Sequence, residues 1–196
     1  MDARIPTSVV MHALLDEAPG EAVSLSWVIE RLGERSFGLL MFLLALIALV
    51  PGLSGFIGVL LMIPAFQMIM ARRVPVLPRF IARRQIPRQH LGRLIARMVP
   101  LLRRAERLFK PRWPTPFEST RRVVGVVILL LGATLIEPIP FSHVIPSLVI
   151  MLVAIAYLEE DGVFLCVALF VALVSLAITA AGIWGTVAGV NFLERL

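Results

Sequence analysis

Hydrophobic positions gather in three long runs along the chain. Residues 37–70 and 123–158 are strongly apolar, but Pro51 and Gly52 interrupt the first run and "EPIPFS" interrupts the second, whereas residues 163–185 form a third run without a break. About 20 consecutive apolar residues suffice for a helix to cross a bilayer, and proline breaks a helix because it lacks the backbone amide. The pattern predicts an all-α integral membrane protein with two Pro/Gly-broken hydrophobic helical repeats, a basic interfacial amphipathic linker and a final transmembrane helix.

This pattern divides one membrane domain into five segments. They are amphipathic N-terminal helices (1–36), the first broken repeat (37–71), the basic interfacial segment (72–121), the second broken repeat (122–158), and the final transmembrane helix with its tail (159–196). In the first segment, Leu25, Val28, Ile29 and Leu32 have helical spacing, and Ser24 is available as a cap. We expect the N-terminal helices to lie on the membrane surface.

The two broken runs share a register. Gly38 and Gly125 are 87 residues apart, and so are Pro51 and Pro138. Broken hydrophobic segments in corresponding halves are typical of internal membrane repeats, although apolar residues also match one another by chance. Because about 35 residues is long for one crossing, we favour a hairpin in each repeat with re-entrant helices. Single broken crossings are the alternative, and they would make the repeats inverted.

The charged residues are concentrated between the two broken runs. Only 16% of residues are charged and 59% are hydrophobic, whereas a soluble domain usually has about 25% charged residues. Of 19 Lys and Arg, 15 lie between Arg72 and Arg122, with only Glu106 and Glu118 as acids. Such a segment is typical of the cytoplasmic face of a bacterial inner membrane. We expect a multi-pass inner-membrane protein with membrane lipids, not nucleic acid, as its partner.

The basic segment carries an amphipathic helical pattern. Apolar residues from Leu91 to Leu108 follow the helical period, and four arginines lie on another face: Arg93, Arg97, Arg104 and Arg107. An apolar stripe beside a guanidinium face is typical of a helix that lies in the membrane interface. We expect these arginines to contact anionic lipid headgroups. A specific site for a lipid-linked phosphate is the sharper alternative, since guanidinium groups suit phosphate oxygens.

The last apolar run has a face of small side chains. They are Ala168, Ala172, Ser175, Thr179 and Gly182. Small residues let helices approach closely in lipid, where packing holds helices together. The sequence therefore predicts a helix-packing face, and we expect a homo-oligomer, most simply a dimer.

The break in the second run contains the candidate polar centre. An ionised Glu137 inside lipid would cost at least about 2.5 kcal/mol without water or a partner, and "EPIPFSHVIP" is too rich in proline for a regular helix. We expect Glu137 and His143 to line a polar pocket where the prolines Pro138 and Pro140 face the Pro51–Gly52 break. The alternative is that this stretch is an exposed turn at the far surface with Glu137 in water.

The sequence offers little support for enzymatic chemistry. Three His lie in three different segments and Cys166 is alone, so we expect no metal site, no cofactor and no catalytic residue to name. Clustered carboxylates occur only in "LEEDG", at Glu159, Glu160 and Asp161. A membrane enzyme acting on a lipid-linked sugar would have to use this cluster.

Several short motifs together resemble a known family. In order they are "LGERSFG", "LVPG", "LPRF", "RRAERLFKPRW", "PIPF" and "EEDG". Together they resemble the ExoD family of bacterial membrane proteins over about Val23 to Gly185. At Ser142 and His143 the chain departs from the Gly-Asn-like pair expected in many relatives. The resemblance implies an inner-membrane accessory or transport role in exopolysaccharide production or export, with the synthesis machinery as a partner. A small ion or proton transporter that affects polysaccharide indirectly is the alternative.

Overall fold

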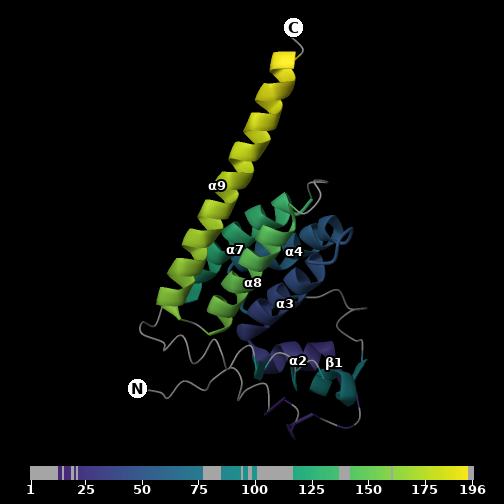
Figure 1. Ribbon diagram of the computed structural model, residues 1–196. Helices are drawn as coiled ribbons and strands as arrows, with labels where there is room; N and C mark the ends of the chain where they lie inside the picture. The colour runs from purple at the N-terminus through teal and green to yellow at the C-terminus, as the bar shows by residue number, and fades with distance from the viewer. Residues whose placement is uncertain are drawn as a thin grey trace.

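The computed structural model describes residues 13–14, 16–18, 20, 22–76, 85–93, 95–96, 99–100, 117–136, 142–159 and 161–193. Within these ranges the protein is mostly helical, as predicted (Figure 1). The labelled helices are α2 (Leu25–Leu32), α3 (Arg35–Ala48), α4 (Ser54–Ile69), α7 (Phe117–Thr134), α8 (Val144–Leu158) and α9 (Gly162–Leu193).

Helices α3, α4, α7 and α8 form a four-helix body. Helices α3 and α4 are an antiparallel pair joined by residues 49–53, and α7 and α8 form a second hairpin; α4 packs mainly on α7, and α3 mainly on α8 (Figure 1). A Cβ atom at Gly55 would lie 3.9 Å from the Cα of Ile136, so both helix breaks lie at one end of the body. We call that end the tip (49–56, 135–136 and 142–145) and the opposite end the base.

Glycines let the two hairpins approach closely. A Cβ at Gly58 would lie 2.6 Å from the carbonyl oxygen of Gly132, and a Cβ at Gly125 would lie 2.8 Å from that of Ala65. Distances this short leave no room for a side chain, so backbone packs directly on backbone where α4 crosses α7. This is the packing mode expected for helices that are not held together by the hydrophobic effect.

A small layer of mixed structure covers the base. Strand β1 (Ala22–Ser24) pairs in antiparallel fashion with β2 (Gln85–Pro87), two strands that the sequence pattern did not predict. They tie the N-terminal segment to the start of the basic segment. Helix α2 follows β1 directly, and its N-terminus is capped as predicted, because the Trp27 amide donates to Ser24 Oγ at 3.3 Å.

The apolar stripe of the basic segment is buried in this layer. Residues 88–93, 95–96 and 99–100 are helical, and Leu91 and Ile95 belong to the same core cluster as Val28 and Leu32 of α2. The sequence analysis expected this stripe, and the apolar face of α2, to lie against lipid. The strand pairing joins the two amphipathic segments, and Val28, Leu32, Leu91 and Ile95 are buried within the protein instead.

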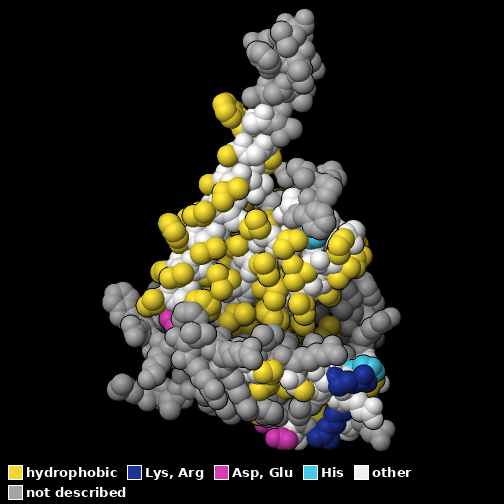
Figure 2. All heavy atoms as spheres, in the orientation of Figure 1, with side chains coloured by type: hydrophobic (Ala, Val, Ile, Leu, Met, Phe, Trp, Pro, Cys, Tyr) yellow, Lys and Arg dark blue, Asp and Glu magenta, His cyan; other side chains and the backbone are white. Residues whose placement is uncertain are grey.

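Helix α9 runs along the body and continues beyond it (Figure 1). Its residues Gly162–Gly185 make up the one described helical stretch that is both long and apolar enough to cross a membrane. Helices α3, α4 and α8 are apolar but shorter. Large apolar side chains are exposed on α4, α8 and α9, whereas the charged groups visible in Figure 2 lie near the base.

Candidate functional site

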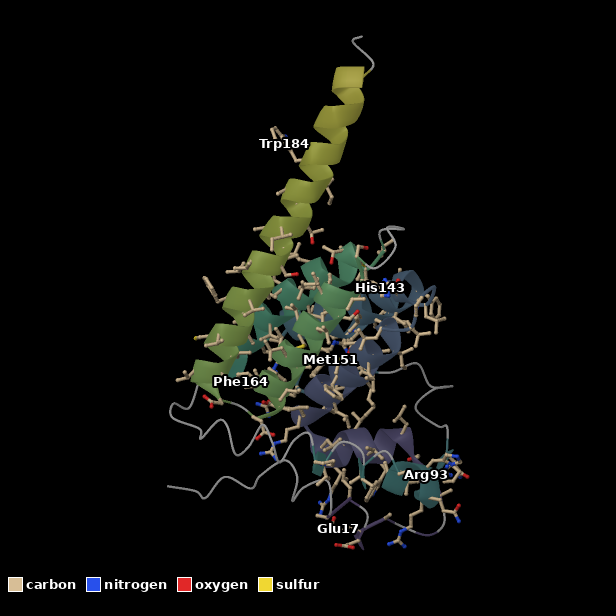
Figure 3. The ribbon with its side chains drawn as sticks, viewed as in Figure 1. Glu17, Arg93, His143, Met151, Phe164 and Trp184 are labelled. Atoms are coloured by element: carbon tan, nitrogen blue, oxygen red, sulfur yellow. The ribbon has the colours of Figure 1, made fainter. Side chains whose placement is uncertain are left out.

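The structure places the predicted polar centre at the tip. His143 lies just before α8 and is 7% exposed, while Pro51 and Gly52 are exposed in the turn between α3 and α4. Figure 3 shows His143 at the end of the body opposite Glu17 and Arg93. The other members of the predicted centre, Glu137, Pro138 and Pro140, lie outside the described residues. The short distance between Gly55 and Ile136 makes the two breaks neighbours, and a polar pocket between them stays a prediction.

A second polar group lies one helical turn below His143. Ser147 is fully buried, its amide donates to the His143 carbonyl at 3.1 Å, and its hydroxyl has no hydrogen-bond partner among the described residues. Positions i and i+4 share a helix face, so the imidazole and the hydroxyl are on the same side of α8. The sequence analysis missed Ser147, although its four-residue spacing from His143 was a readable signal.

The base holds a charged network that joins four parts of the fold. Arg121 of α7 is only 2% exposed; its Nη2 donates to Glu34 Oε1 at 2.6 Å, and its Nη1 donates to the carbonyl oxygens of Ala71 and Arg72 at 3.1 and 3.0 Å. The Tyr157 side chain of α8 also interacts with this guanidinium. An arginine supplies several donors in a fixed plane, so one side chain can connect α4, α7, α8 and the start of α3.

The end of α4 is shaped to meet Arg121. Ala71 has a positive φ of 55°, and the Arg72 amide donates to the Gln67 carbonyl at 3.1 Å, which closes the helix in a left-handed turn. The carbonyls of Ala71 and Arg72 then point away from the helix, where a cation is favoured by the negative end of the helix dipole. The guanidinium therefore supplies donors to two carbonyl oxygens at the end of α4 that have no partner within the helix.

Sequence reasoning missed this network because Arg121 was counted with the basic segment. A signal was present, however. Glu34 and Arg121 are 87 residues apart, which is the offset that relates Gly38 to Gly125. The two charges thus occupy matching positions of the two apolar runs, and they contact each other.

The predicted arginine face is only partly visible. Arg93 is exposed in the layer at the base, and Figure 3 shows it on the outside of that layer. Arg97, Arg104 and Arg107 lie outside the described residues. Contact of this face with anionic lipid stays a prediction.

The predicted small-residue face of α9 divides into two halves. Ala168, Ala172 and Ser175 are buried, and they face the body, because α9 packs on α8 and α7. Thr179 is half-buried and Gly182 is exposed, with no atom within 4 Å of a Cβ added there. The lower half of the face is thus occupied within the chain. A dimer formed through the face stays a prediction and would have to use its upper half.

The carboxylate cluster contains a helix cap. Asp161 is buried, and its Oδ1 accepts from the amides of Val163 and Phe164 at 3.0 and 3.3 Å, which caps the N-terminus of α9. Glu159 lies at the end of α8, and Glu160 lies outside the described residues. Within the part of the chain that the structure describes, no three His, Cys, Asp or Glu side chains are grouped to hold a metal ion.

Comparisons with known proteins show a family and two relatives to which the chain is similar. Residues 7–181 match the family model described as "Exopolysaccharide synthesis, ExoD". The protein named Protein ExoD from Rhizobium meliloti is 26% identical over 170 residues, which cover 82% of this chain and 70% of that protein. An uncharacterised protein of Synechocystis is 26% identical over 152 residues, which cover 74% of this chain and 72% of that protein. No solved structure matches the chain.

Proposed function

The chain belongs to the ExoD family, and from that premise we propose that it is an integral inner-membrane protein with an accessory or transport role in bacterial exopolysaccharide production or export. The observation that carries the membrane location is the distribution of exposed side chains. Large apolar groups are exposed along the outer faces of the body and along α9, as with Phe56, Phe170 and Trp184. A soluble monomer rarely exposes contiguous apolar patches of this kind.

The position of the charges supports one orientation. The basic segment Arg72–Arg122 begins and ends at the base, beside the ends of α4 and α7. Basic residues favour the cytoplasmic side of a membrane. In our proposal the base therefore faces the cytoplasm, each hairpin enters and leaves from that side, and α9 carries the chain across. Exposed arginines such as Arg93 would then lie near anionic headgroups.

The proposed accessory or transport role rests on which buried polar groups are used to hold the fold together and which are not. At the base, Arg121 is engaged in holding helices together, and Asp161 is engaged as a cap. The Ser147 hydroxyl is buried without a hydrogen-bond partner among the described residues, and the buried His143 lies one helical turn before it, close to the meeting point of the two breaks. A buried polar group without such a partner is a candidate for contact with a transported or recruited molecule.

The experiment is genetic complementation with polysaccharide as the readout. A strain that lacks this gene would receive the wild-type gene, a Gly125→Leu variant or a Gly185→Leu variant. Both substitutions add the same side chain to a helix, but a Cβ at Gly125 would press against the Ala65 carbonyl and a Cβ at Gly185 would lie in open space. We expect wild type and Gly185→Leu to restore secreted polysaccharide, and Gly125→Leu to fail.

A second readout separates the accessory or transport role from indirect effects. If His143→Phe and Ser147→Ala accumulate normally in the membrane but lower polysaccharide, the tip takes part in the process. If the purified protein instead moves protons or cations in proteoliposomes without any polysaccharide precursor, the ion-transporter alternative replaces our proposal. Normal polysaccharide in the deletion strain would contradict the proposed role altogether.

A further inference from the structure

Helix α8 ends at the base and α9 begins there, so the extents of the two helices above the base can be compared directly. Helix α8 ends at Leu158 and α9 begins at Gly162. Asp161 fixes the start of α9 through its two capping bonds, and the Leu165 amide donates to its carbonyl at 2.8 Å. Helix α9 then runs away from the base alongside α8. Its residues Phe164, Leu165 and Ala168 are buried against the body.

The body is shorter than the apolar part of α9. Helices α3, α4, α7 and α8 have 14, 16, 18 and 15 residues, which correspond to about 21–27 Å. The apolar stretch Gly162–Gly185 has 24 residues, or about 36 Å. A hydrocarbon core is about 30 Å thick. If α9 crosses the core from the base, the body ends before the far side.

Burial along α9 shows where the body ends. Ser175 is the last buried residue of α9 among those whose side chains are described, and residues 176–185 are half-buried or exposed. Ser175 is 13 residues beyond Gly162, which corresponds to about 20 Å. Figure 3 shows Trp184 on the part of α9 that extends past the tip. About 15 Å of apolar helix therefore continues beyond the last residue that the described part of the body buries.

The large side chains exposed on the described part of the tip are all apolar. Its exposed large side chains are Val50, Leu53, Phe56, Ile136 and Ile145, and Phe56 is 68% exposed. None of the described tip residues is an Asp, Glu, Lys or Arg. A hairpin turn at an aqueous surface normally carries polar residues, because exposed apolar groups cost free energy in water.

Several backbone amides of the tip donate to carbonyl oxygens a few residues earlier in the chain. In the first break the Val50 amide donates to Ile47, the Leu53 amide to Val50 and the Ile57 amide to Leu53, at 3.0–3.2 Å. At the end of α7 the Leu135 and Ile136 amides donate to Gly132 and Ala133. Backbone groups inside a bilayer must find partners within the protein, and these short-range bonds supply many of them.

We propose that the four-helix body penetrates the bilayer only partway and that its tip binds the acyl chains of the far leaflet. Those chains fill the space above the tip and cover the free half of α9. The far leaflet is then locally thin, because its lipids must shorten or bend over a protein surface that ends below the headgroups. The inference rests on the proposed membrane location and orientation, not on the role in polysaccharide production.

Depth-dependent fluorescence quenching tests this inference in the full-length protein. Trp27, Trp113 and Trp184 would be replaced by Phe, and a single tryptophan would be introduced by Phe56→Trp. A matched variant would keep only Trp184. Both would be placed in phosphatidylcholine vesicles that carry bromine at a shallow or a deep acyl position. We expect deep bromines to quench the tryptophan at position 56 most, with little effect of acrylamide in water. Trp184 should be quenched most by shallow bromines.

The opposite pattern would overturn the inference. A body that spans the bilayer would place position 56 at the far interface, so shallow bromines and aqueous acrylamide would both quench it strongly. Ile145→Trp repeats the measurement on the second hairpin if Phe56→Trp fails to fold, and the two should agree. Loss of polysaccharide in the complementation test would leave these depths unchanged, so the inference and the proposed function can fail separately.

Discussion

The hairpins α3–α4 and α7–α8 use similar backbone contacts but different side chains at matching positions. A Cβ at Gly38, near the start of α3, would contact Ala154 and Leu158 of α8. A Cβ at Gly125, midway along α7, would contact Ala65 and Ile69 of α4. In each case a glycine meets an alanine and a larger aliphatic residue four positions later. This correspondence supports an internal repeat, which stays a prediction, with the two hairpins parallel to each other and not inverted.

At the base, a difference in charge between matching positions of the two hairpins produces an ion pair. Glu34 precedes α3 and Arg121 lies in α7, at matching positions that contact each other. If a two-fold axis related the two hairpins, a residue and its counterpart could contact each other only near that axis. Two identical charges in such a position would repel each other. Opposite charges at those positions attract instead. Two hairpins with similar glycine contacts are thus joined at the base by a pair of opposite charges at positions 87 residues apart.

The largest expected effect comes from removing the buried member of that pair. Arg121→Met leaves Glu34 without its partner and the carbonyls of Ala71 and Arg72 without donors. The substitution removes three hydrogen bonds donated by a charged group, and such bonds contribute about 1.5–3 kcal/mol each, so we expect a strongly lowered midpoint of thermal unfolding in detergent. The control is Arg122→Met, because Arg122 is the exposed neighbour and its loss should change little. An equal effect of the two substitutions would contradict this role of the pair.

The two glycine contacts should differ in how far they tolerate a methyl group. A Cβ at Gly125 meets the Ala65 carbonyl oxygen and the Ile69 amide nitrogen, whereas a Cβ at Gly38 meets mainly the Leu158 side chain, which can move. Overpacking typically costs about 1–3 kcal/mol, and we expect Gly125→Ala to lie at the upper end and Gly38→Ala at the lower end. Chemical unfolding of both variants gives the comparison. A larger cost at Gly38 would show that the hairpins are not packed as described.

The cap of α9 has no matching feature beside the first hairpin. Asp161→Ala removes the acceptor for the Val163 and Phe164 amides, and the loss of a cap costs about 1 kcal/mol. Asp161→Asn keeps a capping oxygen and should retain most of the stability and the polysaccharide yield. A loss of polysaccharide in Asp161→Asn with unchanged stability would instead support a catalytic carboxylate.

The smallest effect on stability is expected at Ser147. Its hydroxyl is buried without a partner among the described residues, and an unpaired buried polar group costs about 1–3 kcal/mol in the folded state. Ser147→Ala should therefore leave the unfolding midpoint unchanged or raise it slightly. Gly132→Ala, at the tight Gly58 crossing, is the matched control that should lower it. Clear destabilisation by Ser147→Ala would mean that the hydroxyl has a partner and is not a free functional group.

Parts of the candidate site could be read from the sequence because they depend on local pattern. The breaks at Pro51 and near Pro138 follow from proline chemistry, and the small face at Ala168 and Ala172 follows from helical spacing. The burial of Leu91 and Ile95 in protein could not be read in this way. An amphipathic helix shows the same pattern whether its apolar face meets lipid or another part of the protein, and only the tertiary structure decides between them.

The sequence by itself determined that the chain is helical and strongly apolar, where its long runs break, and that its positive charge lies between them. These properties follow from residue types and spacing alone. The tertiary structure decided which residues become special. It buried Arg121 against Glu34 and the end of α4, used Asp161 as a cap, left the Ser147 hydroxyl without a visible partner and made the body shorter than α9. The physical reason is that burial, pairing and depth depend on contacts between distant segments, which no local pattern records.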